Sequence, residues 1–200
     1  MTGIVSSMAD NLVLGAYDLV LGGLGGLLSF LLGAACSAIM VNYSRRHQLH
    51  SEFALPLLFE ALLLLGFGVL GARLSGTPGL FVPVTVMLLC FIMGLQNALI
   101  TKLSHAEIRT THITGIVTDI GIELGKLLYW NVDQSPQRPP VRVNRQRLRV
   151  LGLLALNFFG GGVLGALGFK YLGYLATLPL ALLLVLLAAV PALDDLSRLG

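Results

Sequence analysis

Charged side chains are scarce in this sequence, and their scarcity excludes an ordinary soluble protein. Only 12% of the residues are Asp, Glu, Lys or Arg, whereas 56% are hydrophobic; soluble domains carry about 25% charged residues. A helix needs about 20 apolar residues to cross a hydrocarbon layer about 30 Å thick. Four stretches of that length contain no charge, residues 19–44, 74–101, 150–169 and 171–193, and a fifth, residues 53–72, contains only Glu60.

These apolar stretches also lack the alternating pattern of membrane β-strands. Backbone N–H and C=O groups inside lipid must be bonded within the structure, and without a β-barrel only helices can do this. We predict an all-α, polytopic transmembrane helical bundle with about five spanning helices. The lipid bilayer is its expected main partner.

Cysteine and catalytic motifs are equally scarce. Cys36 and Cys90 both lie in apolar stretches, where a free thiol behaves as a small hydrophobe, so we predict no disulfide, no metal site and no cofactor. No Walker loop, dinucleotide fingerprint or Ser-His-Asp spacing is present, which argues against an enzyme of the soluble type. The positive charges lie in loops, and no nucleic-acid partner is predicted.

Basic loop residues predict the orientation of the bundle, because they concentrate on the cytoplasmic side. Arg45 and Arg46 follow the first apolar stretch, Lys102 and Arg109 follow the third, and the loop 131–149 carries five arginines. All three loops should be cytoplasmic. The last two stretches then cross outward and back, which places the C-terminus in the cytoplasm.

The segment 112–130 conflicts with this orientation if it spans the membrane. It is amphipathic at helical spacing and ends in Tyr129 and Trp130, which suit an interface. Two interpretations stay open: a helix on the membrane surface, or a re-entrant half-helix. The threonines and the glycine at its start favour re-entry, because a chain that dips and turns must satisfy its backbone groups locally. Glu123 and Lys126 are expected to form a surface pair.

An internal repeat supports the re-entrant interpretation. The run Thr-Gly-Ile-Val occurs at residues 2–5 and 114–117. Each copy precedes an amphipathic stretch, a Gly-rich helix (SFLLGAACSAIM from Ser29, NFFGGGVLGALG from Asn157) and a helix that opens with Leu-Pro. A full unit would cross the membrane three times, so two units in tandem would face opposite ways. This predicts an inverted-topology repeat of residues 1–74 and 75–200, as in many transporters. The glycines should allow close helix contact.

Three motifs also resemble a known family. MTG at the start, GLQNA at residues 94–98 and TTHITGIVTDIG at residues 110–121 resemble the YoaK-like bacterial inner-membrane proteins, the domain of unknown function 1275. The resemblance implies six spanning helices, a location in the bacterial inner membrane and no assigned activity. Relative to that pattern the first helix is absent, which we expect to reflect a start codon placed too late or a truncation, and Ile4 replaces the usual Asn.

The polar residues of the two half-helices and their neighbours form the predicted site of a transporter or channel for a small polar or anionic solute. Half-helix N-termini offer unpaired N–H groups to such a solute. The predicted substrate-binding residues are Thr2, Gly3, Gln96, Asn97, Thr111, His112, Thr114, Gly115, Thr118 and Asp119. Glu60 and His112 are the predicted proton-coupling residues.

Structural roles remain as alternatives for each of these residues. Gln96 and Asn97 could join helices by hydrogen bonds, His112 could bond a carbonyl, and Glu60 could pair with an arginine. Two other functions also stay open. One is a membrane-embedded enzyme that uses His112 with Asp119 or Glu60 on a lipid-soluble substrate, and the other is an accessory subunit that needs a partner or a second copy.

Overall fold

The computed structural model describes residues 1–48, 52–74, 78–103, 113–129 and 141–199, and all its regular elements are helical. The prediction of an all-α protein is therefore confirmed. The elements are α1 (Thr2–Val13), α2 (Tyr17–Arg46), α3 (Ala54–Leu74), α4 (Pro78–Leu103), α5 (Ile113–Leu128), α6 (Arg145–Leu172), the 3₁₀ helix η1 (Gly173–Ala176) and α7 (Thr177–Leu199).

Four helical stretches in the described ranges are long and apolar enough to cross a membrane. They are Tyr17–Arg46, Ala54–Gly71, Pro83–Leu103 and Arg145–Ala189. The last one runs through α6, η1 and most of α7. The predicted spanning stretches thus fall on α2, α3, α4, α6 and α7, and the chain is a polytopic helical membrane protein.

Two glycines with positive φ divide this apolar chain into helices. Gly173 has φ +59° and ends α6, where its N–H bonds to the carbonyl of Phe169. Gly15 has φ +75° and turns the chain between α1 and α2. Residues with a Cβ atom rarely adopt a positive φ. The glycines therefore explain why α1 ends before α2 and why α6 ends before η1 and α7.

Helices α2 and α4 approach each other closely, and two glycines make this approach possible. A Cβ added at Gly33 would overlap the backbone carbonyl oxygen of Phe91, and one added at Gly94 would overlap that of Phe30. Each glycine thus receives the backbone of the opposite helix, as small residues do at membrane helix crossings. Near the ends of these helices, the Lys102 ammonium donates to the carbonyl of Ala38 at 3.2 Å.

An aromatic cluster joins α3 to the region where α6 meets α7. The ring of Tyr174 lies edge-on to Phe67, with centroids 5.8 Å apart, and to Phe169, with centroids 6.2 Å apart. Gly71 leaves the space that this tyrosine ring fills, and Gly68 faces Thr177. Edge-to-face pairs of this kind contribute about 0.5–1.5 kcal/mol beyond the area that they bury.

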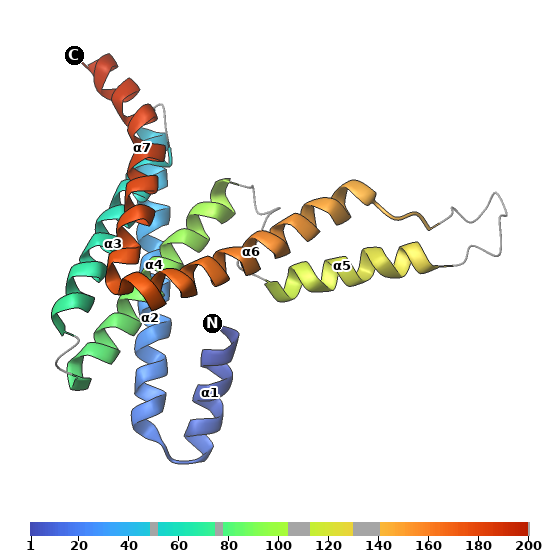
Figure 1. Ribbon diagram of the computed structural model, residues 1–200, viewed down its shortest axis with the longest axis horizontal. Helices are drawn as coiled ribbons and strands as arrows, with labels where there is room; N and C mark the ends of the chain where they lie inside the picture. Colours follow the sequence, from blue (N-terminus) through green and yellow to red (C-terminus); the bar gives the residue numbers. More distant parts are fainter. Residues whose placement is uncertain (49–51, 75–77, 104–112, 130–140, 200) are drawn as a thin grey trace.

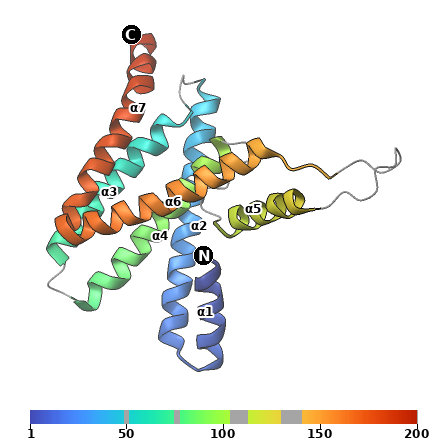
Figure 2. The same cartoon turned by 45° about the vertical axis from the view of Figure 1, so that its right-hand side comes forward.

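The two short helices each fold back along a long one. Helix α1 lies beside α2, and α5 lies beside α6 (Figure 1). Among the described helices α5 contacts only α6, and α5 and the first part of α6 extend together away from α2, α3 and α7 in both views (Figures 1 and 2). The predicted segment 112–130 is therefore a helix over Ile113–Leu128, packed along the first part of α6.

Candidate functional site

The tip of α1 lies halfway along α2. Ile4 and Met8 pack over Gly23 of α2, and Ile4 also reaches Gly26. Met1 and Thr2 then border the same pocket as Phe30 and Ala34, close to the midpoint of this 30-residue helix. The Thr-Gly tip is thus at half depth if α2 spans the membrane. Gly3 is exposed, and a Cβ there would meet no atom within 4 Å, so packing does not require glycine.

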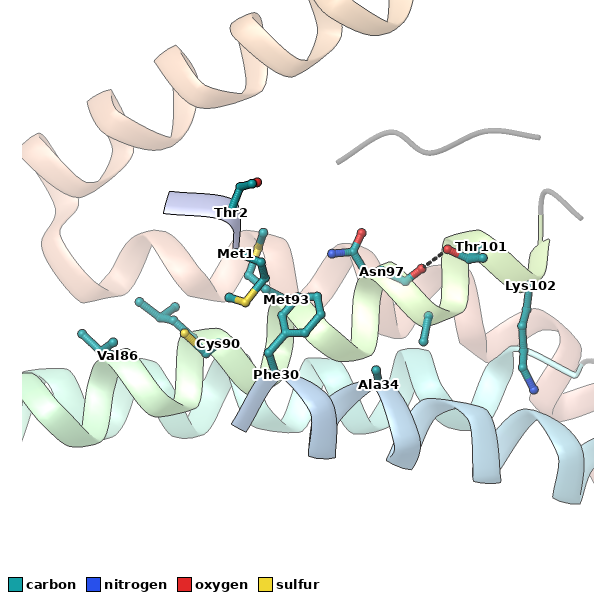
Figure 3. A pocket seen from close by; sticks show the side chains of 12 residues that line it. Met1, Thr2, Phe30, Ala34, Val86, Cys90, Met93, Asn97, Thr101 and Lys102 are labelled. Carbon is teal, nitrogen blue, oxygen red and sulfur yellow. Dashed lines mark hydrogen bonds between the residues drawn. The ribbon is translucent and has the colours of Figure 1, made fainter. Parts of the chain in front are cut away.

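A pocket of about 610 Å³ lies between this tip, α2 and α4 (Figure 3). Such a volume suits a small-molecule ligand, for which pockets of about 300–1,000 Å³ are usual. Most of its wall is apolar, and its polar residues are Thr2, Asn97, Thr101 and Lys102. The residues around it are Met1, Thr2, Phe30, Ala34, Val86, Leu89, Cys90, Met93, Asn97, Ala98, Thr101 and Lys102.

Two polar groups at the pocket are engaged within the chain. The Thr101 hydroxyl donates to the backbone carbonyl of Asn97 at 2.7 Å. The Lys102 ammonium is turned onto α2, where it donates to Asn42 Oδ1 at 2.8 Å. Only the aliphatic stem of Lys102 is therefore left at the pocket edge, and the Asn97 side chain places an amide in the pocket wall.

Gln96, the neighbour of Asn97, points to a different place. Its amide donates to a carboxylate oxygen of Glu60 on α3, which is 3% exposed. The partner of Glu60 in the described residues is thus an amide on α4. On α2 the hydroxyls of Ser37 and Ser44 are also buried, without a hydrogen-bond partner among the described residues. Buried hydroxyls of this kind are commonly satisfied by internal water.

The second Thr-Gly element does not meet the first. Thr114 and Gly115 are exposed in the first turn of α5, which contacts only α6 among the described helices. The Thr118 hydroxyl donates to the carbonyl of Thr114 at 2.8 Å, and Asp119 accepts from Arg147 of α6 at 3.0 Å. None of these residues lines the pocket at Thr2. Thr111 and His112 lie outside the described residues.

Glu123 is buried, which corrects the expectation of a simple surface pair with Lys126. It is 1% exposed, and it accepts from the Lys126 ammonium and from the backbone N–H of Asn144, both at 2.8 Å. The Asn144 side chain in turn caps α6 by accepting from the N–H of Arg147. The hydrogen bond from Lys126, and next the one from Asn144, lower the pKa of Glu123.

This carboxylate should make the α5–α6 pair sensitive to acid. The pKa of Glu123 is lower in the folded protein than its usual value of about 4.3. Its stabilising contribution is therefore complete above that usual value and is lost as the pH falls through the lowered pKa. We expect the distance between spin labels at the exposed positions Gly125 and Gln146 to be narrowly distributed at pH 7 and to broaden as the pH falls through the lowered pKa.

Two variants check the assignment of this acid response to Glu123. Glu123→Gln should broaden the spin-label distances already at pH 7. Asp119→Asn removes a more exposed ion pair and should have the smaller effect, since such pairs contribute little. A distance distribution that Glu123→Gln leaves unchanged at pH 7 would contradict the prediction.

Sequence reasoning missed the apolar part of the pocket. Cys90, Met93 and Asn97 share one face of α4, because they are spaced three and four residues apart. That spacing was available as a signal. It did not stand out because apolar residues occupy every face of this helix, and only Asn97 differs in polarity.

The fold and the pocket define a class of protein: a helical integral membrane protein with a mainly apolar pocket beside a short helix tip. The comparison with known families is more specific. Residues 1–190 match the family described as "Protein of unknown function (DUF1275)", and the chain belongs to that family. The resemblance seen in the sequence motifs is thereby confirmed. No curated protein and no solved structure matches the chain.

Proposed function

We propose that this membrane protein is a small-solute transporter or channel, with its site at the tip of α1. One observation carries the proposal: Thr2 reaches the midpoint of a spanning helix and borders a pocket that also contains Asn97. A short helix that ends at half depth has no role in crossing the membrane. Polar solutes, by contrast, are bound near the midplane at such helix ends in many transporters.

The chemistry of the pocket favours a neutral polar solute or a small anion. The first N–H groups of α1 have no partner within the helix, and Met1 provides no side-chain cap. These groups and the positive end of the helix dipole can hold such a solute. Asn97 adds an amide. Since Lys102 is engaged by α2, none of the described side chains that line the pocket offers it a cation, and this disfavours polyanions.

The second half of the site is proposed at Thr114 and Gly115. The α5–α6 pair repeats the form of the α1–α2 pair, in which a short helix lies back along a Gly-rich long helix (Figure 1). This likeness supports two inverted units, 1–74 and 75–200. In this arrangement the protein lies in the inner membrane, with the loop 131–149 and the C-terminus in the cytoplasm.

Glu60 is the proposed proton-coupling residue. A carboxyl group this deeply buried in a spanning helix is costly to keep without a function or a partner. The amide of Gln96 satisfies one of its oxygens, and Gln96 is next to Asn97 on α4. A change at Glu60 can therefore reach the pocket through two adjacent residues of α4. His112 stays a predicted second proton carrier.

Flux measurements in proteoliposomes test the proposed site. The purified protein would be offered a panel of small anions and neutral polar solutes. Asn97→Leu should weaken the apparent affinity for the transported solute about fivefold, because a typical hydrogen bond contributes about 1 kcal/mol. Thr114→Ala combined with Gly115→Leu should reduce flux through the second half-site.

A matched control separates the site from a general effect of losing an amide. Asn157 is exposed on α6 and does not line the pocket, so Asn157→Leu should leave flux unchanged. Unaltered flux of every solute in both site variants, with normally folded protein, would show that the proposed site is wrong.

A further inference from the structure

Four arginines lie together where the chain enters α6. Arg142 precedes the helix, Arg145 begins it, and Arg147 and Arg149 follow within its first five residues, all four with exposed side chains. Arg147 pairs with Asp119 of α5 at 3.0 Å. The other three, which we call the arginine cluster (Arg142, Arg145 and Arg149), have no ion pair or hydrogen bond to another side chain among the described residues.

Helix geometry places the cluster on the side of α6 that faces away from α5. Successive residues are about 100° apart around a helix, so Arg145 and Arg149 lie within about 40° of each other, whereas Arg147 is about 200° from Arg145. Since Arg147 meets Asp119 on α5, Arg145 and Arg149 point away from that helix. No other described helix contacts this part of the α5–α6 pair (Figure 1).

The nearby carboxylates do not neutralise the cluster. Asp119 is taken by Arg147. Glu123 is buried and already accepts from Lys126 and from the N–H of Asn144. The positive charge of the cluster is therefore left for a ligand from outside the described chain.

The position along α6 identifies the kind of ligand. The uncharged run begins at Val150, directly after Arg149, and continues to Phe169. Arg145 lies about 6 Å further along the helix axis from Arg149. The headgroup layer on each side of a bilayer is about 5–8 Å thick. Both guanidinium groups therefore fall at the depth of the lipid phosphates when α6 spans.

We propose that Arg142, Arg145 and Arg149 form a binding site for the phosphate of an anionic lipid. Guanidinium groups bind phosphate oxygens through two parallel N–H bonds, and residues four apart on a helix have Cβ atoms about 5–6 Å apart. Two such groups can hold one phosphate between them. Arg142, in the segment just before the helix, supplies a third guanidinium.

A role in orientation alone does not require this arrangement. Orientation depends on the number of basic residues near the membrane and not on the helix face that they occupy. Lysine would serve it as well as arginine. A phosphate site, in contrast, depends on arginine geometry and on the shared face of Arg145 and Arg149.

Native mass spectrometry of the full chain in detergent tests the site with three probes: phosphatidylglycerol, phosphatidylcholine and inorganic phosphate. The wild-type protein should retain phosphatidylglycerol in preference to phosphatidylcholine. Arg145→Gln with Arg149→Gln should weaken that binding about 30-fold, since each basic residue contributes about 1 kcal/mol of attraction to anionic lipid. Arg145→Lys with Arg149→Lys keeps the charge and should still weaken binding several-fold.

The control removes the same charge elsewhere. Arg46→Gln with Lys170→Gln changes two exposed cations outside the cluster and should leave the preference for phosphatidylglycerol unchanged. An equal loss of lipid in this control, or no preference for phosphatidylglycerol in the wild type, overturns the proposal. Inorganic phosphate that binds as tightly as the lipid would also overturn it, by showing a site for free phosphate. The wild-type comparison holds even if a variant fails to fold, and none of these readouts depends on transport.

Discussion

Replacing Gly33 by alanine is expected to destabilise the protein by about 1–3 kcal/mol or more, the usual cost of forcing extra atoms into a packed interior. The added methyl group would overlap the carbonyl oxygen of Phe91. Because that atom belongs to the backbone of α4, it can move only if the whole helix moves. Gly94→Ala should cost a similar amount, since its methyl group would overlap the carbonyl of Phe30. Thermal unfolding in detergent, with urea or SDS titration for the free energy, measures both.

Other glycines of the chain provide graded controls for this prediction. A Cβ at Gly22 or Gly161 would meet no atom within 4 Å, so alanine there should leave the unfolding temperature unchanged or raise it, because alanine favours helix. At Gly25 the nearest atom is the terminal methyl group of Met87, which can rotate away, and an intermediate loss is expected. Equal stability of Gly33→Ala and Gly22→Ala would refute the close α2–α4 contact.

The glycines also show which features of the fold could be predicted from the sequence and which could not. The composition and the uncharged runs were sufficient to predict the helices, because an apolar run of 20 residues has few alternatives in lipid. They were not sufficient to predict which glycine makes contact. Gly22 and Gly33 are both in the apolar run of α2, yet only Gly33 meets the backbone of another helix. That difference depends on where α4 crosses α2, and the sequence of α2 alone does not indicate the position of the crossing.

The candidate site was predictable to a similar extent. Thr2 and Asn97 were both predicted and both line one pocket. Gln96 was grouped with Asn97 because they are adjacent, but adjacent helical residues point about 100° apart, and Gln96 turns to Glu60 instead. The contact of Glu123 with Asn144 could not be predicted from the sequence, for another reason. Asn144 is 21 residues further along the chain, and only the pairing of α5 with α6 brings it close.

Replacing Gln96 by leucine is expected to be the most damaging change at the polar contact between α3 and α4. It leaves the carboxyl of Glu60, which is 3% exposed, without its amide donor. An unsatisfied buried polar group costs about 1–3 kcal/mol, and more when it is charged. Glu60→Gln keeps a side chain of the same shape that can still accept from Gln96, so its loss of stability should be smaller.

The double variant Glu60→Leu with Gln96→Leu distinguishes a specific pair from two separate losses. When both polar groups are removed together, neither is left unsatisfied, and a pair of apolar residues can be nearly neutral. The double variant should therefore be more stable than Gln96→Leu alone. Asn157→Leu, an exposed amide on α6, is the matched control and should change the unfolding free energy by less than about 0.5 kcal/mol. Residues in contact couple by about 0.5–3 kcal/mol, so additive losses of stability in the cycle would mean that Glu60 and Gln96 do not interact. Any effect of Glu60 on the pocket would then have to pass through another residue.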